Sequence, residues 1–326
     1  MPKENSLQKF TKCWILTDGK AGMENQCVAL ADRLGLNPVN KRISVRTPWS
    51  FLPPQLWAMP FSALNDKSDQ LEPPWPDILI STGRQTVALA LAIKKFSPST
   101  FLIQIQNPTM ALKKFDVVIA PKHDRLCAKN VVCTFGALHG VTNERLENAY
   151  KEFVAEYSEL PKPLIGVLIG GSNKTFQFTK EKVEQFALML REAVNNSGGS
   201  LAITPSRRTS ENNFRIIKET LKDVPVNIWD GLGKNPYFGI LAHADTFVVT
   251  GDSVNMVSEA IATKKPVHVY KNFGGSIKFD RFHNELEKLE RTRPFTGKIE
   301  SWEYEGIDDM TIAANAVKKA WDDYKN

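Results

Sequence analysis

The chain has 326 residues, of which 42% are hydrophobic and 24% are charged, as in soluble globular proteins. This length suffices for two domains of ordinary size, each with its own core. No apolar run reaches the roughly 18 residues that a membrane span needs. Residues 1–11 lack the apolar core of a signal peptide, so we expect a cytoplasmic protein.

The net charge of +6 suits an anionic ligand or an anionic membrane surface, although plain cytoplasmic proteins often carry such a charge. The sequence has no dense basic block and no interleaved basic–aromatic stripe, so we expect no nucleic-acid partner. Four cysteines, at positions 13, 27, 127 and 133, show no C-x-x-C spacing. We expect buried free thiols and no metal site.

The first half alternates strands and helices. Residues 12–17 predict a strand, 18–22 a glycine loop and 23–34 a helix. Further strands are expected at 77–81, 100–106 and 115–120, with a helix over 82–95. Pro108 and Pro121 end the last two strands, because proline cannot extend a central ladder.

After a charged candidate linker at 151–163, the same alternation begins again. Strands are expected at 164–169, 200–204, 227–229, 247–249 and 266–270, with helices at 179–194 and 310–324. This alternation predicts a parallel sheet covered by helices on both faces. The fold class is therefore α/β, with two Rossmann-like doubly wound domains facing a cleft. We place them at 1–155 and 156–326, and the last helix is free to pack back on the first domain.

The segment 244–260 carries the strongest functional signal. Phe247, Val248 and Val249 predict a buried strand, and the glycine turn at Gly251 leads into a helix that Asp252 or Ser253 can cap. Free N–H groups at a helix N-terminus form a phosphate site, and Glu259 is placed to reach a ribose hydroxyl. The alternative is an ordinary capped helix with a buried Ser–Glu pair.

Two other loops of the second half follow predicted strands, where doubly wound sheets bind ligands. In 170–175, the backbone at Gly171 and Ser172 could cradle a phosphate and Lys174 could add charge, or the loop is a plain turn. It is neither a P-loop nor a G-x-G-x-x-G fingerprint. In the loop 206–209, Arg207 or Arg208, with Thr209, could hold a pyrophosphate, or the loop is simply solvated.

In the first half the corresponding loops are 18–22, with Gly19 and Gly22, and 82–85, with Arg84. Asp18 at the tip of the first strand could serve as a general base for an acceptor hydroxyl, or it could stabilise the turn. Glu24 and the His123–Asp124 pair are lesser candidates.

The segment 47–61 is rich in aromatic residues and proline. It could form an amphipathic lip for a lipid-linked acceptor or a membrane surface. The favoured interpretation is a connection packed onto the first sheet.

Several motifs together resemble the "elongated mitochondria" mitochondrial-fission family, which has plant and bacterial members. The resemblance runs from about residue 12 to residue 300 and rests on five stretches, at 14–26, 136–142, 170–174, 204–209 and 250–260. It implies a glycosyltransferase-B-type fold whose C-terminal domain binds a donor nucleotide and whose N-terminal domain binds an acceptor, without a bound metal. Arg207, Ser253 and Glu259 would then be donor contacts, and Asp18 would be the base by position.

The leading hypothesis is a metal-independent glycosyltransferase that needs no cofactor and takes a nucleotide-diphosphate sugar as substrate. Its acceptor would be a glycan or a lipid-linked molecule of envelope synthesis, with peripheral contact to the inner membrane left open. The rival is a non-catalytic, fission-factor-like binding or scaffold protein on the same fold. An NAD-dependent sugar epimerase, a loose description of some bacterial members, fits less well because the NAD fingerprint is missing. We do not expect a fission role for this chain.

Overall fold

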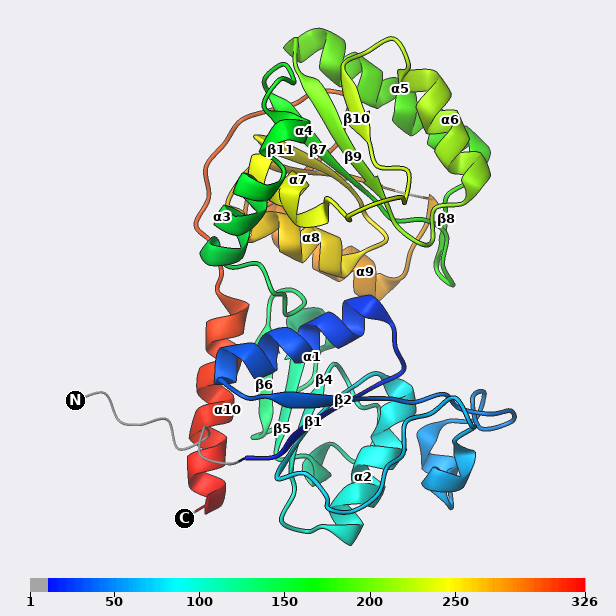
Figure 1. Cartoon of the computed structure of the whole chain (residues 1–326), viewed down its shortest axis with the longest axis vertical. Coiled ribbons are helices and arrows are strands. Elements are labelled where there is room, and N and C mark those ends of the chain that lie inside the picture. The colour runs from blue at the N-terminus through cyan, green and yellow to red at the C-terminus, as the bar shows by residue number, and fades with distance from the viewer. Residues whose placement is uncertain (1–10, 272, 326) are drawn as a thin grey trace, which may run out of the picture. The chain divides into compact units, whose positions relative to one another are not determined.

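The computed structural model describes residues 11–271 and 273–325, and the chain divides into two α/β units (Figure 1). Unit 1 runs to Gly140 and includes the segment from Asp308 onward, whereas unit 2 is Val141–Ile307. The division thus falls earlier than residue 155. The reason is that the segment around 143–157 is helical and buries Phe153 and Tyr157 in the core of unit 2. The expected linker at 151–163 is therefore partly helix.

The sheet of unit 1 has six parallel strands in the order β2-β1-β3-β4-β5-β6. Its strands are β1 Cys13–Thr17, β2 Pro38–Arg42, β3 Ile78–Thr82, β4 Phe101–Ile105, β5 Val117–Pro121 and β6 Val131–Thr134. Its α-helices are α1 Ala21–Leu34, α2 Val87–Phe96 and α10 Asp309–Lys325. Five short 3-10 helices complete it: η1 Pro54–Leu56, η2 Pro60–Ala63, η3 Arg84–Thr86, η4 Leu112–Lys114 and η5 Lys122–Asp124.

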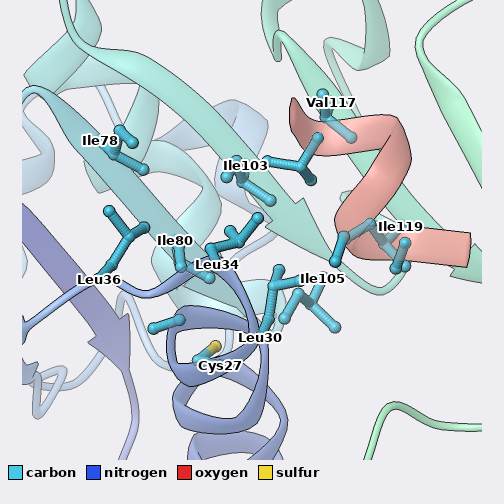
Figure 2. Packing of buried hydrophobic residues seen from close by; sticks show 14 of the residues in the cluster. Cys27, Leu30, Leu34, Leu36, Ile78, Ile80, Ile103, Ile105, Val117 and Ile119 are labelled. Atoms are coloured by element: carbon cyan, nitrogen blue, oxygen red, sulfur yellow. The ribbon is translucent and has the colours of Figure 1, made fainter. Parts of the chain in front are cut away.

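Helices cover both faces of this sheet, as the apolar runs of its strands require. On one face, Cys27, Leu30 and Leu34 of α1 pack against isoleucines of β3 and β4 (Figure 2). Helix α10 joins the same cluster through Val317 and Trp321. On the other face, α2 packs with Trp14 and Leu16 of β1 and with the segment between β2 and β3.

The sheet of unit 2 also has six parallel strands, in the order β10-β9-β7-β11-β12-β14. Its strands are β7 Leu164–Ile169, β9 Ser200–Pro205, β10 Val226–Ile228, β11 Thr246–Thr250, β12 Val267–Tyr270 and β14 Arg293–Pro294, and a separate antiparallel pair is formed by β8 Phe176–Gln177 and β13 Phe273–Gly274. Its helices are α3 Asn143–Glu152, α4 Val154–Tyr157, α5 Lys180–Ser197, α6 Glu211–Leu221, α7 Tyr237–His243, α8 Val254–Ile261 and α9 Ile277–Lys288. The two doubly wound sheets confirm the predicted fold class.

Two of the four cysteines are buried, as expected, and the other two are exposed. Cys13 on β1 and Cys27 on α1 are buried free thiols, and burial raises the pKa of Cys13 to about 12. The prediction is wrong for Cys127 and Cys133, which are exposed. The reason is that β6, which carries Cys133, is the edge strand, and Cys127 lies in the connection leading to it.

No helix formed by the described residues combines the length and the apolarity that crossing a membrane requires.

A substitution at Trp321 tests how much the C-terminal helix α10 contributes to the stability of unit 1. The Trp321 ring is 3% exposed and meets the Phe101 ring edge-on, with 5.3 Å between the centroids. We expect Trp321→Ala to lower the free energy of unfolding by about 3–5 kcal/mol, because it leaves a cavity in the core. Urea unfolding followed by circular dichroism measures this. Ile312→Ala on the same helix is the control, since Ile312 is 46% exposed and its loss should change little. Equal losses for both variants would contradict the packing.

Candidate functional site

The candidate site of unit 2 lies where the winding of its sheet reverses. From β7 the chain continues to β9 on one side, whereas β11 lies on the other side of β7. The connections that leave β7 and β11 therefore depart to opposite faces, and doubly wound sheets bind ligands at the carboxyl ends of such strands. Two of the predicted loops, 170–174 and 251–253, follow these two strands.

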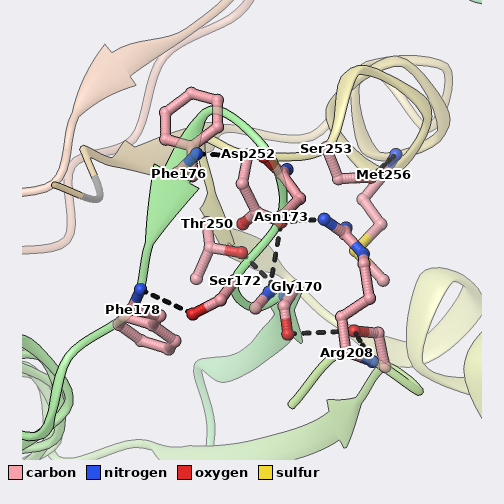
Figure 3. A network of polar contacts seen from close by, with 12 residues as sticks. Gly170, Ser172, Asn173, Phe176, Phe178, Arg208, Thr250, Asp252, Ser253 and Met256 are labelled. Atoms are coloured by element: carbon pink, nitrogen blue, oxygen red, sulfur yellow. Dashed lines mark hydrogen bonds and ion pairs between the residues drawn. The ribbon is translucent and has the colours of Figure 1, made fainter. Parts of the chain in front are cut away.

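The loops of this edge are held together by Asp252, whose side chain is fully buried (Figure 3). Its carboxylate accepts the Gly171 N–H at 3.1 Å and pairs with the Arg208 guanidinium at 2.6 Å. The Gly170 N–H donates to Thr250 Oγ1 at 2.7 Å, and Ser206 Oγ donates to the Gly170 carbonyl at 2.9 Å. The structure thus brings the three predicted loops of the second half together.

Close packing explains the two glycines after β7. A Cβ on Gly170 would lie 2.1 Å from the Asp252 carboxylate, and one on Gly171 would lie 2.1 Å from the Arg208 carbonyl oxygen. Any larger residue would therefore separate the loops. Here glycine is required for close approach, and neither residue has the positive φ of a left-handed turn.

Some of the residues predicted to bind a ligand already have partners within the protein, whereas others are exposed. Arg208 is paired to Asp252, and the Thr209 hydroxyl donates to the Gly170 carbonyl, so both residues hold the loop. Ser172 accepts the Phe178 N–H through its Oγ at 3.0 Å. Lys174 and Arg207 are exposed, and neither has an ion-pair partner among the residues that the structure describes. These two cations are available to an anion.

Ser253 is the N-cap of α8, and its Oγ accepts the Met256 N–H at 3.4 Å. The Gly251 N–H donates to the Tyr270 carbonyl at 2.9 Å. The Gly251 carbonyl accepts a hydrogen bond from His283 Nε2 at 2.7 Å. Burial lowers the pKa of His283, which favours the neutral ring. This contact from His283 holds the turn between β11 and α8.

Glu259, on α8, lies in a polar cluster that the sequence did not indicate. The Tyr237 hydroxyl of α7 donates to its carboxylate, and Arg145 of α3 acts on it electrostatically. Arg145 also stacks over the Phe238 ring, 3.6 Å from its centroid. Burial raises the pKa of Glu259 to about 7, although the Tyr237 hydrogen bond and the Arg145 charge act in the opposite direction. The Ser–Glu pair of the alternative interpretation is not among the contacts that Glu259 makes with the described residues.

In unit 1 the reversal lies between β1 and β3, and the loops after them carry the other predicted residues. Asp18 pairs with the Lys20 ammonium; the Asp18 side chain is 10% exposed and that of Lys20 is 71% exposed. Gly19 has φ +76, as a tight turn needs. Gly22 lies inside α1, so the loop is shorter than predicted, and its carbonyl accepts the Gln26 side-chain amide.

The remaining predicted groups of unit 1 have other partners. Arg84 donates to the Ser50 carbonyl at 2.8 Å and thereby contacts the aromatic segment that precedes β3. Glu24 accepts both the Nε and an Nη of Arg42, at 2.9 and 2.7 Å. His123 and Asp124 lie in η5 with nearly buried side chains, 3.9 Å apart. The described residues contain no group of three or more His, Cys, Asp or Glu side chains that could hold a metal ion.

Comparison with known proteins now gives the family. The model of the mitochondrial fission ELM1 family matches residues 21–321. The chain belongs to this family. The mitochondrial fission protein ELM1 of Arabidopsis thaliana is 35% identical over 272 residues, and the match covers 75% of this chain and 64% of that protein. An uncharacterised protein of Rickettsia prowazekii is 27% identical, with 94% of this chain and 98% of that one covered.

Solved structures give the fold. UDP-N-acetylglucosamine 2-epimerase from Rickettsia bellii superimposes with a TM-score of 0.56 and 10% identity, covering 97% of this chain and 96% of that one. The S. aureus MnaA–UDP co-structure gives a TM-score of 0.53 at 14% identity, with 96% and 97% covered. At these identities the likeness concerns the fold alone. This ELM1-family member therefore has a glycosyltransferase-B-type fold of two Rossmann-like units.

The Arg208–Asp252 pair should couple strongly in a double-mutant cycle. We expect Arg208→Gln and Asp252→Asn each to lower the free energy of unfolding, with a coupling of about 1–3 kcal/mol, because Asp252 is fully buried and Arg208 only half-exposed. Urea unfolding of the two single variants and the double variant measures the coupling. The exposed Lys180–Glu184 pair, 3.7 Å apart, is the matched control and should couple by at most about 0.5 kcal/mol. Equal coupling in the two pairs would refute the role of Asp252.

Glu259 should make stability depend on pH. Its raised pKa means that the folded chain holds a proton that the unfolded chain releases, so its contribution is fully present below about pH 4.5. That contribution is lost as the pH rises through about 7. We expect Glu259→Gln to remove the loss and to be more stable than the parent chain at about pH 8, by up to about 3 kcal/mol. Urea unfolding across this range measures it, with the exposed Glu184→Gln as control. A parallel pH profile for Glu259→Gln would exclude the raised pKa.

Proposed function

We propose that the chain is a metal-independent glycosyltransferase that takes a nucleoside-diphosphate sugar as donor. The supporting observation is the junction of three loops on Asp252 at the reversal of the sheet in unit 2. The Lys174 and Arg207 cations on two of these loops are exposed, and the third loop leads into the N-terminus of α8. The nucleotide sugar is a substrate, and no resident cofactor is part of the proposal. The enzyme would act in the cytoplasm on an envelope glycan or a glycolipid.

Known structures of the same fold support a nucleotide-sugar ligand. The Neisseria meningitidis UDP-GlcNAc 2-epimerase was solved bound to UDP-GlcNAc, and superimposes with a TM-score of 0.51. The MnaA structure contains UDP. The ligands of these proteins make uridine nucleotides the first to test. Because both are under 25% identical to this chain, their own reaction is not transferred to it.

In this proposal the diphosphate meets Lys174 and Arg207 together with the backbone at Ser172 and Ser253, because the N–H groups of Gly171 and Gly251 already donate within the protein. Arg208, Thr209 and Asp252 keep these groups in place, since their polar atoms are already engaged with the loops. Glu259 accepts a ribose hydroxyl. Negative charge grows on the departing diphosphate during transfer, so preorganised cations and N–H groups lower the barrier.

The acceptor would bind unit 1 along the loops with Gly19, Gly22 and Arg84. Its hydroxyl oxygen attacks the anomeric carbon of the sugar, the bond from that carbon to the diphosphate oxygen breaks, and Asp18 takes the hydroxyl proton. Lys20 is largely exposed, so its ammonium can return to water when an acceptor binds. A lipid-linked acceptor would bring the protein into peripheral contact with the inner membrane.

Thermal shift with UDP, GDP, CMP and their sugars tests donor binding. We expect stabilisation by one nucleotide and its sugar, and an affinity loss of about tenfold or more in Lys174→Ala/Arg207→Ala, because two charge-assisted contacts are lost. Lys180→Ala/Arg215→Ala, which removes two exposed cations elsewhere in unit 2, should bind as the parent chain does. If no nucleotide stabilises the protein, the transferase proposal fails and the scaffold hypothesis replaces it. Bound NAD with retained activity in Glu259→Ala would instead support an epimerase.

Asp18 is tested separately from donor binding. With the donor identified, we expect Asp18→Asn to lower transfer by about a hundredfold or more while leaving nucleotide affinity unchanged, because only the proton acceptor is lost. Product mass spectrometry and nucleotide titration give the two readouts. Asp32→Asn, on the exposed side of α1, is the control. Full transfer by Asp18→Asn would assign the base to another residue.

A further inference from the structure

The segment between β2 and β3 buries some of its apolar side chains and exposes others. Pro54, Trp57 and Ala63 are buried and pack toward α2, as expected for a connection on the sheet. Phe51, Leu56 and Met59, however, are 79%, 62% and 71% exposed. Figure 1 shows this segment in blue beside α2, at the margin of unit 1. The large apolar side chains thus face solvent on a segment that is otherwise anchored in the core.

The charged residues of this segment are few and basic. From Ser44 to Asn65 the sequence has one charged residue, Arg46, and Asp66 follows the segment. Arg46 is exposed, with its guanidinium 5.0 Å from the centroid of the Trp49 ring. Arg84 is exposed and donates to the Ser50 carbonyl at 2.8 Å. The Gln55 amide reaches the Thr109 carbonyl, a few residues before the exposed Lys113 and Lys114.

The backbone around the exposed side chains is already hydrogen-bonded. The N–H groups of Phe51, Leu52 and Leu56 donate to carbonyls three residues earlier, at 3.0–3.1 Å, and Ala58 donates to Leu56. A segment that enters an apolar medium must satisfy its backbone groups internally. These tight turns do so for each of these donors, whereas a plain extended loop would not.

We propose that Phe51, Leu56 and Met59, together with Arg46 and Arg84, form a docking surface for an anionic lipid bilayer. The apolar side chains insert at the level of the headgroups, and the cations meet the lipid phosphates. Charge favours this occupant, because the surface is basic and the chain carries +6. Docking requires no nucleotide and no catalysis, so it goes beyond the proposed function.

Vesicle co-sedimentation of the full chain tests the docking surface. We expect binding to vesicles of phosphatidylcholine with phosphatidylglycerol, much weaker binding to phosphatidylcholine alone, and a decrease with added salt. Phe51→Ser/Leu56→Ser/Met59→Ser should lower partitioning by about tenfold or more, because three apolar side chains no longer leave water. Leu188→Ser/Leu232→Ser/Ile312→Ser removes three other exposed apolar side chains and should bind like the parent chain.

A variant that removes one cation tests the contribution of charge separately from that of the apolar side chains. Arg46→Gln should weaken binding to the anionic vesicles severalfold and leave binding to neutral vesicles unchanged. Thermal shift with the nucleotide should be the same in the triple variant and in the parent chain, which shows that the variant is folded. It also keeps a failure of docking distinct from a failure of donor binding.

Three results would overturn the proposal. One is a parent chain that does not bind the anionic vesicles. Another is a Phe51/Leu56/Met59 variant that binds them as well as the parent chain. The third is a parent chain that is dimeric by light scattering and becomes monomeric in that variant, since the surface would then join two copies of this chain.

Discussion

The buried carboxylate of Asp252 is the contact on which the arrangement of the three loops in unit 2 depends. A carboxylate without solvent must be paired or hydrogen-bonded, and Asp252 satisfies this through the Gly171 N–H and the Arg208 guanidinium. Each partner comes from a different loop, so one desolvated charge fixes the relative position of all three. The glycines at 170 and 171 follow from the same contact, because only a residue without Cβ lets the chain come this close.

The pair with Asp252 gives the two arginines of the loop 206–209 different roles. Read from the sequence, Arg207 and Arg208 are equivalent candidates for a pyrophosphate. In the structure, Arg208 is committed to Asp252 and its charge is largely compensated, whereas Arg207 remains exposed and unpaired among the described residues. A carboxylate next to a proposed diphosphate site would normally repel the ligand, but here it is neutralised within the protein. The net attraction for an anion therefore comes from Arg207 and Lys174.

The sequence allowed the buried central strands and the loops after them to be predicted, because buried parallel strands leave continuous apolar runs and glycine turns follow them. It did not allow the partners to be predicted. The Tyr237–Glu259 contact joins α7 to α8 across the packed unit, and neither residue type signals the other. The short strands β2 and β6 were missed because Pro38–Arg42 and Val131–Thr134 lie near sheet edges and lack a buried apolar run. The same edge position exposes Cys133.

The choice between the acidic side chains of unit 1 rests on how each is held. Glu24 accepts two hydrogen bonds from the Arg42 guanidinium, a planar bidentate contact that an incoming hydroxyl would have to break. Asp18 accepts the Lys20 N–H at 3.4 Å and pairs with the Lys20 ammonium, and the Lys20 side chain is 71% exposed. Its contact with the ammonium is not bidentate, and the ammonium can return to water. Displacing Lys20 frees an acceptor oxygen at the carboxyl end of β1, beside the reversal between β1 and β3. Of the two carboxylates, Asp18 is therefore the one that can exchange its present partner for the proton of a substrate.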